Sequence, residues 1–420
     1  MSNRQQRKAL NSILNVDRVT REGPSFIFVG RVVSHVADRF AEMVARDGVH
    51  EQIELDFSRA RAAFADAMAS IVIAVRDLRQ RGHEATIVLP TERKLERLFR
   101  STDWAHHLEP SRYPSVGKVS DRHLPMQLFG ESTAQMAAVR RTMAIVASTT
   151  TLPRDLYLAL DWSLQEITDN VLCHSDDDRG GLIQVVTKAD DVQVVVGDCG
   201  RGILSCMQDE FPAILTEEDA IVEAVKQGVT SKPSTNQGNG LAGTLSVGLA
   251  SGGGLSILSG AARVYWTRAE TATVRRYAAS HPGTLVNLSL RRRKAFDVGE
   301  ALSLGGERAE LDGYLEFQYW AQAQDMYCFR VADSDEGYAS RAAGAYARCL
   351  CANMLEEGTA PLVIDWEGIE IVSASFADEL VAKLRVGLGT AKFGSRVRLK
   401  NMSAEVRGAI AAALEKRPAK

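Results

Sequence analysis

The sequence predicts an α/β protein built from several small domains, and three observations lead to this prediction. Short apolar runs that end at glycine, proline or aspartate alternate with longer amphipathic runs along most of the chain, which is typical of strands alternating with helices. The 420 residues and the 45% share of hydrophobic residues suffice for more than one core, since a chain of this length has about three domains. Two stretches without the alternation, 111–129 and 296–310, divide the chain into three blocks.

The composition excludes several classes of protein. The net charge of −3 gives no general attraction to nucleic acid or to an anionic membrane. No apolar run reaches the roughly 18 residues of a membrane span, and the basic N-terminal stretch MSNRQQRKALNSILNV lacks the apolar core of a secretory signal. The six cysteines form no CxxC pair, which favours a reducing cytoplasm over a zinc site or a disulfide framework. We therefore expect a cytoplasmic protein that binds neither nucleic acid nor membranes.

The first block is expected to follow an N-terminal extension, 1–23, and to form a small α/β domain over 24–110. Its short β-rich runs and its amphipathic runs alternate, and Gly82 is a stop signal for the first helix. The predicted strands are 26–30, 53–57 and 84–90, and the predicted helices are 64–82 and 94–108.

The second block spans 130–295. Two helical runs open it, strands follow, and a region rich in glycine, serine and threonine at 228–260 interrupts the strands. The predicted helices are 132–148 and 152–175, and the predicted strands are 182–188, 192–198, 262–267 and 284–290.

The third block, 311–420, has the same order of strand, short turn and helix as the first. The stretch ELDFSRARAAFADAM at 54–68 is similar to IDWEGIEIVSASFADEL at 364–380. We favour an internal duplication, and convergence of two strand–helix units is the alternative. The predicted strands are 326–332, 361–366 and 396–401, and the predicted helices are 340–355, 375–388 and 403–416.

A carboxylate and a carboxamide lie one helical turn apart in the sequence EITDN. Residues four apart share a helix face, so Glu166 and Asn170 are neighbours. Such a pair can supply a general base and a metal ligand. The alternative is a solvated helix edge beside the core positions Ile167 and Val171.

Polar residues also follow the predicted strand 192–198. Asp198 ends this strand, and Gly200 and Gly202 come directly after it in DCGRGI. A carboxylate at a strand end can accept a hydrogen bond from an exocyclic amine, and the glycines allow a close approach of the backbone to a ligand. Thr284 begins the last predicted strand of the block.

The glycine-rich stretch GVTSKPSTNQGNGLAG resembles a phosphate-binding loop. It contains Thr230, Lys232, Gly238 and Gly240. Backbone N–H groups of such a loop can hold phosphate oxygens, and a lysine can neutralise the phosphate charge.

In order and spacing these stretches resemble the motifs of the GHKL ATPase superfamily, which includes gyrase, histidine kinases and the mismatch-repair ATPases. EITDN resembles the N box, DCGRGI and GNGLAG resemble the two glycine boxes, TSK resembles the end of the mobile lid, and the dipeptide GT resembles the last box. The resemblance covers about two fifths of the chain and implies a Bergerat-type domain that binds ATP and Mg²⁺. The residues that it carries over are Glu166, Asn170, Asp198, Gly200, Gly202, Ile203, Thr230, Lys232, Gly238, Gly240, Leu241 and Thr284.

The resemblance also implies roles for these residues. Glu166 would be the general base and Asn170 the Mg²⁺ ligand. Asp198 would bind the adenine amino group with the help of Thr284, and Lys232 with the glycine loop would hold the phosphates.

The sequence departs from the family in two respects. Ala242 stands in GNGLAG where many members have glycine. His174 is the only histidine between residues 130 and 200, and it lies inside the helix of the N box, which argues against an ordinary sensor histidine kinase.

The third block resembles STAS-like domains, the fold of anti-sigma-factor antagonists, so the resemblances imply a central ATPase domain with STAS-like domains on either side. In antagonists a serine at the start of the first helix accepts phosphate, and Ser375 or its neighbour Ser373 stands there. The alternative is that this serine only caps the helix. Phe376 replaces the usual glycine, and the first block has Ala63 at the corresponding position.

These observations lead to a hypothesis of function and leave alternatives open. The leading hypothesis is a bacterial cytoplasmic regulatory ATPase that signals through its STAS-like domains to a regulatory protein, by ATP hydrolysis or by phosphoryl transfer to serine. One alternative is a nucleotide-gated interaction module with little turnover. Another is a conformational ATPase clamp, which would be a homodimer.

Overall fold

The protein has an α/β fold, and the part of the chain that the structure describes forms three sheets. The computed structural model describes residues 17–46, 49–116, 124–188, 191–230, 239–267, 272–291, 297–302, 313–334, 337–356 and 360–417. Within these ranges, no helix is both long and apolar enough to cross a membrane.

The chain forms two compact units, which are described separately. The first unit contains Met1–Val139, Ser163–Val186 and Asp191–Arg291, and the second contains Arg140–Trp162, Thr187–Asp190 and Arg292–Lys420. The predicted first block and most of the predicted second block therefore lie in one unit, while the predicted third block makes up most of the other.

The first sheet has the strand order β1-β2-β3-β4. The β1–β2 pair is antiparallel, and the two following pairs are parallel. The strands are β1 (Arg18–Glu22), β2 (Ser25–Val32), β3 (Gln52–Ala63) and β4 (Glu84–Val88), and the helices are α2 (Ser34–Arg46), α3 (Ala65–Gln80), α4 (Arg93–Ser101) and α5 (Trp104–Leu108). The sequence did not predict β1 or α2. The single helix predicted at 94–108 is two helices, because Asp103 adopts the left-handed conformation with φ 59°.

The second sheet has the order β5-β6-β7-β9-β8. Its strands are β5 (Gln127–Phe129), β6 (Gly181–Thr187), β7 (Asp191–Asp198), β8 (Gly254–Trp266) and β9 (Thr273–Arg291). The associated helices are α6 (Ser132–Thr149), α7 (Arg154–His174), α8 (Gly202–Gln208), α9 (Glu217–Ala224) and α10 (Gly240–Ala250). The strands β8 and β9 form a hairpin much longer than the predicted strands 262–267 and 284–290.

The β8–β9 hairpin is irregular at its centre. Ser259 pairs with Thr284, but the next residue, Gly260, pairs with His281, and Ala262 pairs with Arg276. Extra residues on β9 therefore bulge out of the ladder between residues 276 and 284. Bulges of this kind bend a strand and redirect its side chains. This stretch of β9 is called the bulged segment below.

The third sheet repeats the topology of the first. Its order is β10-β11-β12-β13, with one antiparallel pair followed by two parallel pairs, as an internal duplication would produce. The strands are β10 (Trp320–Ala321), β11 (Met326–Arg330), β12 (Leu362–Asp365) and β13 (Val397–Lys400). The helical elements are α11 (Val298–Ala301), α12 (Tyr314–Tyr319), η1 (Gln322–Gln324), η2 (Val331–Asp333), α13 (Arg341–Leu355), α14 (Ala374–Ala377), η3 (Asp378–Ala382), α15 (Lys383–Leu388), α16 (Thr390–Arg396) and α17 (Ala404–Lys416).

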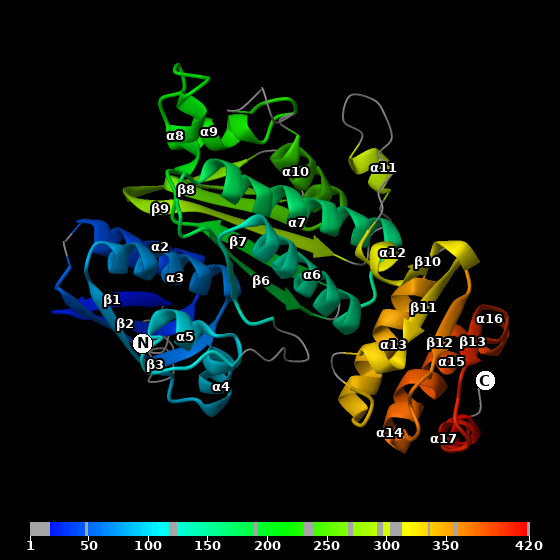
Figure 1. The fold of residues 1–420 in the computed structure, drawn as a ribbon. Coiled ribbons are helices and arrows are strands. Elements are labelled where there is room, and N and C mark those ends of the chain that lie inside the picture. The colour runs from blue at the N-terminus through cyan, green and yellow to red at the C-terminus, as the bar shows by residue number, and fades with distance from the viewer. Residues whose placement is uncertain are drawn as a thin grey trace, which may run out of the picture. The chain divides into compact units, whose positions relative to one another are not determined.

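One hydrophobic core runs through the first two sheets of the first unit. The helices α2 and α3 lie between these sheets (Figure 1). Four side chains of the second sheet, one from each of β6, β7, β8 and β9, join the apolar residues of the first block in this core: Leu182, Val195, Leu258 and Leu285. The predicted boundary between the first two blocks is thus crossed by continuous apolar packing, which favours burial of both surfaces together.

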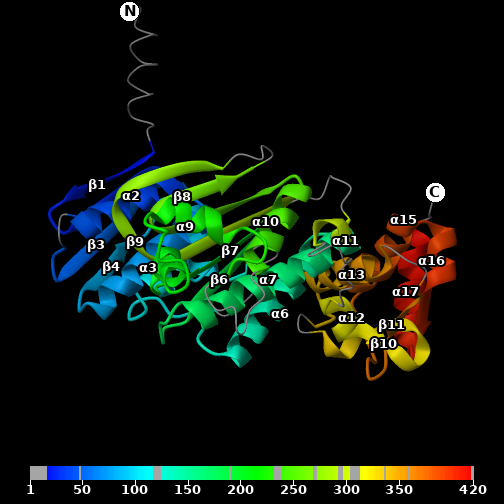
Figure 2. The same cartoon turned by 90° about the horizontal axis from the view of Figure 1, so that it is seen from above.

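A buried ion pair joins α2 to the β8–β9 hairpin. Arg263 of β8 donates from Nε to Asp38 Oδ2 at 3.0 Å and from Nη2 to Asp38 Oδ1 at 2.5 Å, and both side chains are 1% exposed. The Tyr277 hydroxyl of β9 donates to the same carboxylate. Burial by itself would lower the pKa of Arg263, but Asp38 outweighs it and holds that pKa above its usual value. Figure 2 shows the hairpin beside α2.

In the second unit, one asparagine connects α13 with the segment that joins α6 and α7. The Asn353 amide donates to the carbonyl oxygens of Ala147 at 2.6 Å and Thr150 at 3.0 Å, and its oxygen accepts from the Leu152 N–H at 3.1 Å. A buried carboxamide with these partners satisfies backbone groups that would otherwise lack hydrogen bonds.

The ion pair gives a prediction for stability. We expect Arg263→Met to lower the free energy of unfolding by about 3–5 kcal/mol, because the Asp38 carboxylate would stay buried without its cation. Urea unfolding followed by circular dichroism measures the change. Replacing the whole group, with Asp38→Leu, Arg263→Met and Tyr277→Phe together, should recover most of the loss.

The control for Arg263→Met is a second arginine–aspartate pair of the first unit. Arg31 pairs with Asp17 at 2.8 Å while its side chain is 64% exposed, so Arg31→Met should change stability far less. Equal losses in Arg263→Met and Arg31→Met would contradict the importance of burial.

Candidate functional site

The first group of candidate residues surrounds Asp198, the last residue of β7. Its side chain is buried, and Oδ1 accepts a hydrogen bond from the Gly200 N–H at 2.7 Å. The Thr284 N–H also donates to this carboxylate. Gly283 has φ +66°, and a Cβ there would overlap the Asp198 carbonyl oxygen, so only glycine fits. The end of β7 and the middle of β9 are therefore held against each other at Asp198.

Burial changes the acidity of Asp198. Loss of water raises its pKa from 3.8 to about 6, against the lowering effect of the hydrogen bonds from Gly200 and Thr284. The nearby Asp177 raises it further, and Arg179 lowers it. A strongly perturbed carboxyl group of this kind is a marker of functional sites.

The hydroxyl of Ser259 connects the rest of this group, and the sequence prediction missed it. It accepts from the Ile203 N–H at 2.8 Å and lies 3.2 Å from Thr284 Oγ1. Gly202, which begins α8, lies directly against it. A serine within the apolar run LSILSG of β8 was the available signal. Asp198, Gly200, Gly202, Ile203 and Thr284 are thus brought together.

The second group surrounds Glu166 on α7. A Cβ at Gly240 would lie 2.5 Å from Glu166 Oε2, so the carboxylate is directly beside the first residue of α10. The absence of a side chain at Gly240 makes this approach possible. Burial, and then the charge of Asp169, raise the pKa of Glu166. The carboxylate therefore faces a helix N-terminus, whose N–H groups and dipole favour negative charge.

The remaining candidates divide into those that the structure describes and those that it does not. Asn170 is half-buried one turn after Glu166 on α7, Leu241 is half-buried in the first turn of α10, and Thr230 is half-buried in the preceding loop. Lys232 and Gly238 lie outside the described residues.

Asn239, which the sequence prediction also missed, connects the two sides of the stretch 231–238. Its Oδ1 accepts from the Gly228 N–H at 3.2 Å, so the ends that flank this stretch lie together at the start of α10.

The helix α7 connects the two groups. Immediately after its end, the Ser175 carbonyl accepts from the Arg201 N–H at 2.9 Å, and a Cβ at Gly200 would overlap this carbonyl oxygen. Nine residues separate Glu166 from Ser175, which is about 13 Å along a helix. Glu166 and the turn after Asp198 therefore lie at two points along α7 that are about 13 Å apart.

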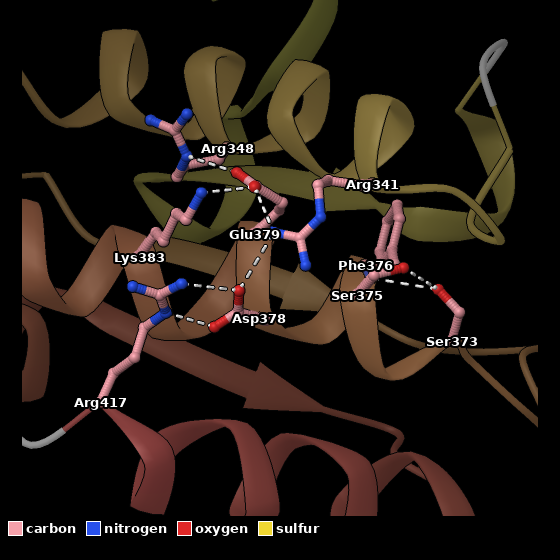
Figure 3. A network of polar contacts seen from close by, with 9 residues as sticks. All are labelled: Arg341, Arg348, Ser373, Ser375, Phe376, Asp378, Glu379, Lys383 and Arg417. Atoms are coloured by element: carbon pink, nitrogen blue, oxygen red, sulfur yellow. Dashed lines mark hydrogen bonds and ion pairs between the residues drawn. The ribbon is translucent and has the colours of Figure 1, made fainter.

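A separate polar cluster lies at the start of the helical segment 374–388 in the second unit (Figure 3). Glu379 is buried and pairs with Arg341 at 2.9 Å, with Arg348 at 3.7 Å and with Lys383. Burial by itself would raise the pKa of Glu379, but Lys383 and Arg341 outweigh it and lower that pKa.

The neighbouring Asp378 is neutralised in the same way. It pairs with Arg341 at 3.4 Å and with Arg417, and Arg417 is the first cause of its lowered pKa. Without these cations, Asp378 and Glu379 would be like charges close to a phosphate on Ser375. Cations from α13, α15 and the residue after α17 surround both acids, so this opposition is largely removed.

The two candidate serines differ in their contacts. Ser373 is the N-cap, because its Oγ accepts from the Phe376 N–H at 3.1 Å. Ser375 lies inside the first turn, with Oγ 3.1 Å from Ser373 Oγ. The capping role therefore belongs to Ser373, and Ser375 as a phosphate acceptor stays a prediction.

Comparison with known proteins does not narrow the choice of family or function. No protein-family model matches the chain, and no curated protein sequence is significantly similar to it.

The raised pKa of Asp198 gives a prediction for stability against pH. Between about pH 4 and 6 the folded state keeps a proton that the unfolded state has lost, so the free energy of unfolding falls as pH rises through this window. Asp198→Asn removes this effect. We expect the variant to exceed the wild type by about 1–3 kcal/mol at pH 7 and by much less near pH 4, as measured by urea unfolding.

Asp177 provides a control with the opposite sign. Burial by itself would raise its pKa, but the hydrogen bonds from Arg179 outweigh it and lower that pKa, so Asp177 stabilises the fold at neutral pH and loses this effect as pH falls. Asp177→Asn should therefore destabilise by about the same amount at pH 7 and at pH 4, and by less only below about pH 3.8, the usual pKa of an aspartate. If Asp198→Asn behaved like Asp177→Asn, Asp198 would be an ordinary ion-pair residue.

Proposed function

We propose that the protein is a cytoplasmic regulatory ATPase or serine kinase that binds Mg²⁺-ATP along the surface between Asp198 and Glu166. The observation that carries the proposal is the buried carboxylate of Asp198, held by backbone N–H groups of Gly200 and Thr284 and raised in pKa to about 6. Burying a carboxyl group without a cation directly bonded to it costs free energy. Such a cost is typical of a site in which a ligand supplies the missing donor.

The adenine end would be formed by Asp198, Thr284 and Ser259. The Asp198 carboxylate accepts hydrogen bonds, so it would bind the exocyclic amine of adenine, while the hydroxyl groups of Ser259 and Thr284, 3.2 Å apart, hold this end of the site in place.

The phosphate end would be formed by the start of α10. Its first N–H groups lack intrahelical acceptors, and together with the helix dipole they form an anion site. Glu166 lies beside Gly240 at this end, where its carboxylate would accept a proton from the attacking hydroxyl group. The roughly 13 Å between Glu166 and Ser175 along α7 suits a ligand with a base at one end and a triphosphate at the other.

The Mg²⁺ ion would need few protein ligands. No group of three or more histidine, cysteine, aspartate or glutamate side chains suited to a metal occurs within the described ranges. Mg²⁺ is commonly held by one or two protein oxygens together with phosphate oxygens and water, and the half-buried Asn170 carboxamide, one turn from Glu166, offers such an oxygen. When bound, the metal would neutralise phosphate charge.

The acceptor of the phosphoryl group separates the candidate functions. Water as acceptor gives an ATPase, a docked serine gives a kinase, and no transfer gives a nucleotide-gated interaction module or a dimeric clamp. Incubation with ATP labelled on the γ-phosphate, alone and with cell lysate, distinguishes released phosphate from labelled protein. A protein that fails to bind ATP in calorimetry would exclude all of these functions.

The C-terminal block is proposed as the STAS-like signalling domain. Its sheet has the topology of the first sheet, and the exposed Arg341 and Arg417 side chains pair with Asp378, three residues after Ser375 (Figure 3). A regulatory protein partner would bind this domain, in a manner that a phosphate on Ser375 could change.

The first functional prediction concerns adenine. We expect Asp198→Asn to weaken ATP binding by about 1–3 kcal/mol, since part of the acceptor is replaced by a donor. Calorimetry with ATP and Mg²⁺ measures the change. Combined with the expected gain in stability at pH 7, this would identify Asp198 as a residue kept for binding. Unchanged affinity would reduce DCGRGI to a structural turn.

The second functional prediction separates binding from chemistry. Glu166→Ala should abolish turnover while ATP still binds, because a general base acts only in the transition state. Asn170→Ala should weaken the Mg²⁺-dependent part of binding as well. Phosphate release and calorimetry, with and without Mg²⁺, measure the two effects, and wild-type turnover in both variants would make EITDN an ordinary helix face.

A further inference from the structure

The helix α3 of the first block lies directly behind the proposed adenine end. Ser70 and Ile73 of α3 contact the second sheet, and Asp77, at the same helical spacing, lies 4.0 Å from Arg179 in the loop before β6. Positions three and seven residues apart share one helix face. One face of α3 is therefore devoted to the sheet that carries Asp198 and Thr284.

Ile73 contacts the backbone next to Asp198. Its Cδ1 atom would lie 2.6 Å from a Cβ at Gly197, and its carbonyl oxygen is 3.6 Å from Cys199 Sγ. Successive residues of a strand face opposite sides of a sheet. Because Gly197 faces α3, Asp198 faces the proposed ligand, and Ile73 supports the residues on both sides of it.

Ser70 supports the bulged segment next to Thr284. Its Oγ lies 3.0 Å from His281 Nε2, and both side chains are buried. Burial lowers the pKa of His281 to about 4, so the imidazole is neutral at physiological pH and needs no counter-charge. His281 and Thr284 belong to the same bulged segment, in which Gly283 touches Asp198. A shift of His281 would therefore move the residues that hold the carboxylate.

We propose that Ser70 and Ile73 are positioning residues for adenine recognition, and that α3 thereby couples the first block to the nucleotide site. The inference rests on the proposed function. Ile73 fixes Asp198 through Gly197, and Ser70 fixes Thr284 through His281. The first block therefore contributes to the proposed ATP site by positioning Asp198 and Thr284. By linkage, any partner that shifts α3 changes ATP affinity, and ATP changes the affinity for that partner by the same factor.

The test uses two small deletions in the full-length protein. Ile73→Val removes only the Cδ1 methyl group that contacts Gly197, and Ser70→Ala removes only the hydroxyl group. Binding of ATP and of inosine triphosphate, which lacks the exocyclic amine, is measured by calorimetry. We expect the wild type to prefer ATP at least about 5-fold. In each variant ATP affinity should fall about 3–10-fold, while the affinity for inosine triphosphate stays nearly constant.

Matched controls separate positioning from general damage. Ile71→Val deletes the same methyl group from an equally buried isoleucine that lies about 200° around the same helix. Ser25→Ala deletes a hydroxyl group that bonds Glu54 at 3.0 Å within the first block. Both controls should keep the wild-type preference for ATP, and thermal melts show that every variant is folded.

Each outcome decides between the hypotheses. Loss of ATP preference in Ile73→Val and Ser70→Ala but not in the controls supports the inference. Three outcomes would overturn the inference alone, provided that the wild type binds ATP. The variants could lose affinity equally for both nucleotides, the controls could lose as much ATP preference as the variants, or the variants could keep the wild-type preference for ATP. A wild type that binds neither nucleotide overturns the proposed function and the inference with it.

Discussion

The contact between the first two blocks depends on the buried ion pair of Asp38 with Arg263. Apolar packing between α3 and the second sheet favours association but is not directional. The ion pair is directional, because a guanidinium and a carboxylate match in only a few geometries. Two hydrogen bonds from Arg263 and one from the Tyr277 hydroxyl fix both strands of the β8–β9 hairpin on one carboxylate of α2. Without it, α2 and the hairpin would be joined by apolar packing and by the hydrogen bond from the Ala278 N–H to Glu42 Oε1.

This contact sets the shape of the candidate site. The hairpin is held at Arg263 and Tyr277 by α2, and at His281 by α3. Between these points β9 leaves the regular β8–β9 ladder. Directly after them, Gly283 and Thr284 lie against Asp198, next to the pair Gly197–Leu285 of the β7–β9 ladder. The irregular part of β9 is thus held by α2 and α3 from the side opposite the proposed ligand. The binding surface can then be stiff although glycine is abundant in it.

The sequence allowed prediction of whatever depends on short spacings. Glu166 and Asn170 share a face because they are one turn apart, and Gly200 meets Asp198 because it is two residues away. Ser259 and Thr284 are 25 residues apart in the sequence and meet because β8 pairs with β9. No local pattern encodes the register of that pairing. The pair Ser259–Thr284 is the last of the regular ladder before the bulges of β9, and these bulges were equally invisible in the sequence. For the same reason the serine cap of α14 could be anticipated, while the cations around Asp378 and Glu379, which come from other helices, could not.

The helix α3 is buried on nearly all sides, with 12 buried residues, from Ala65 to Leu78, among its 16, as expected of a helix whose first part, 65–75, contains only two polar residues, Asp66 and Ser70. A helix of this kind needs a neighbour on every face. Cutting the chain between residues 111 and 129 would follow the apparent boundary in the sequence, yet it would expose the apolar sides of both α3 and the second sheet to water. Each half would then be prone to self-association, so the first two blocks would have to be inherited, expressed and exchanged between proteins as one piece.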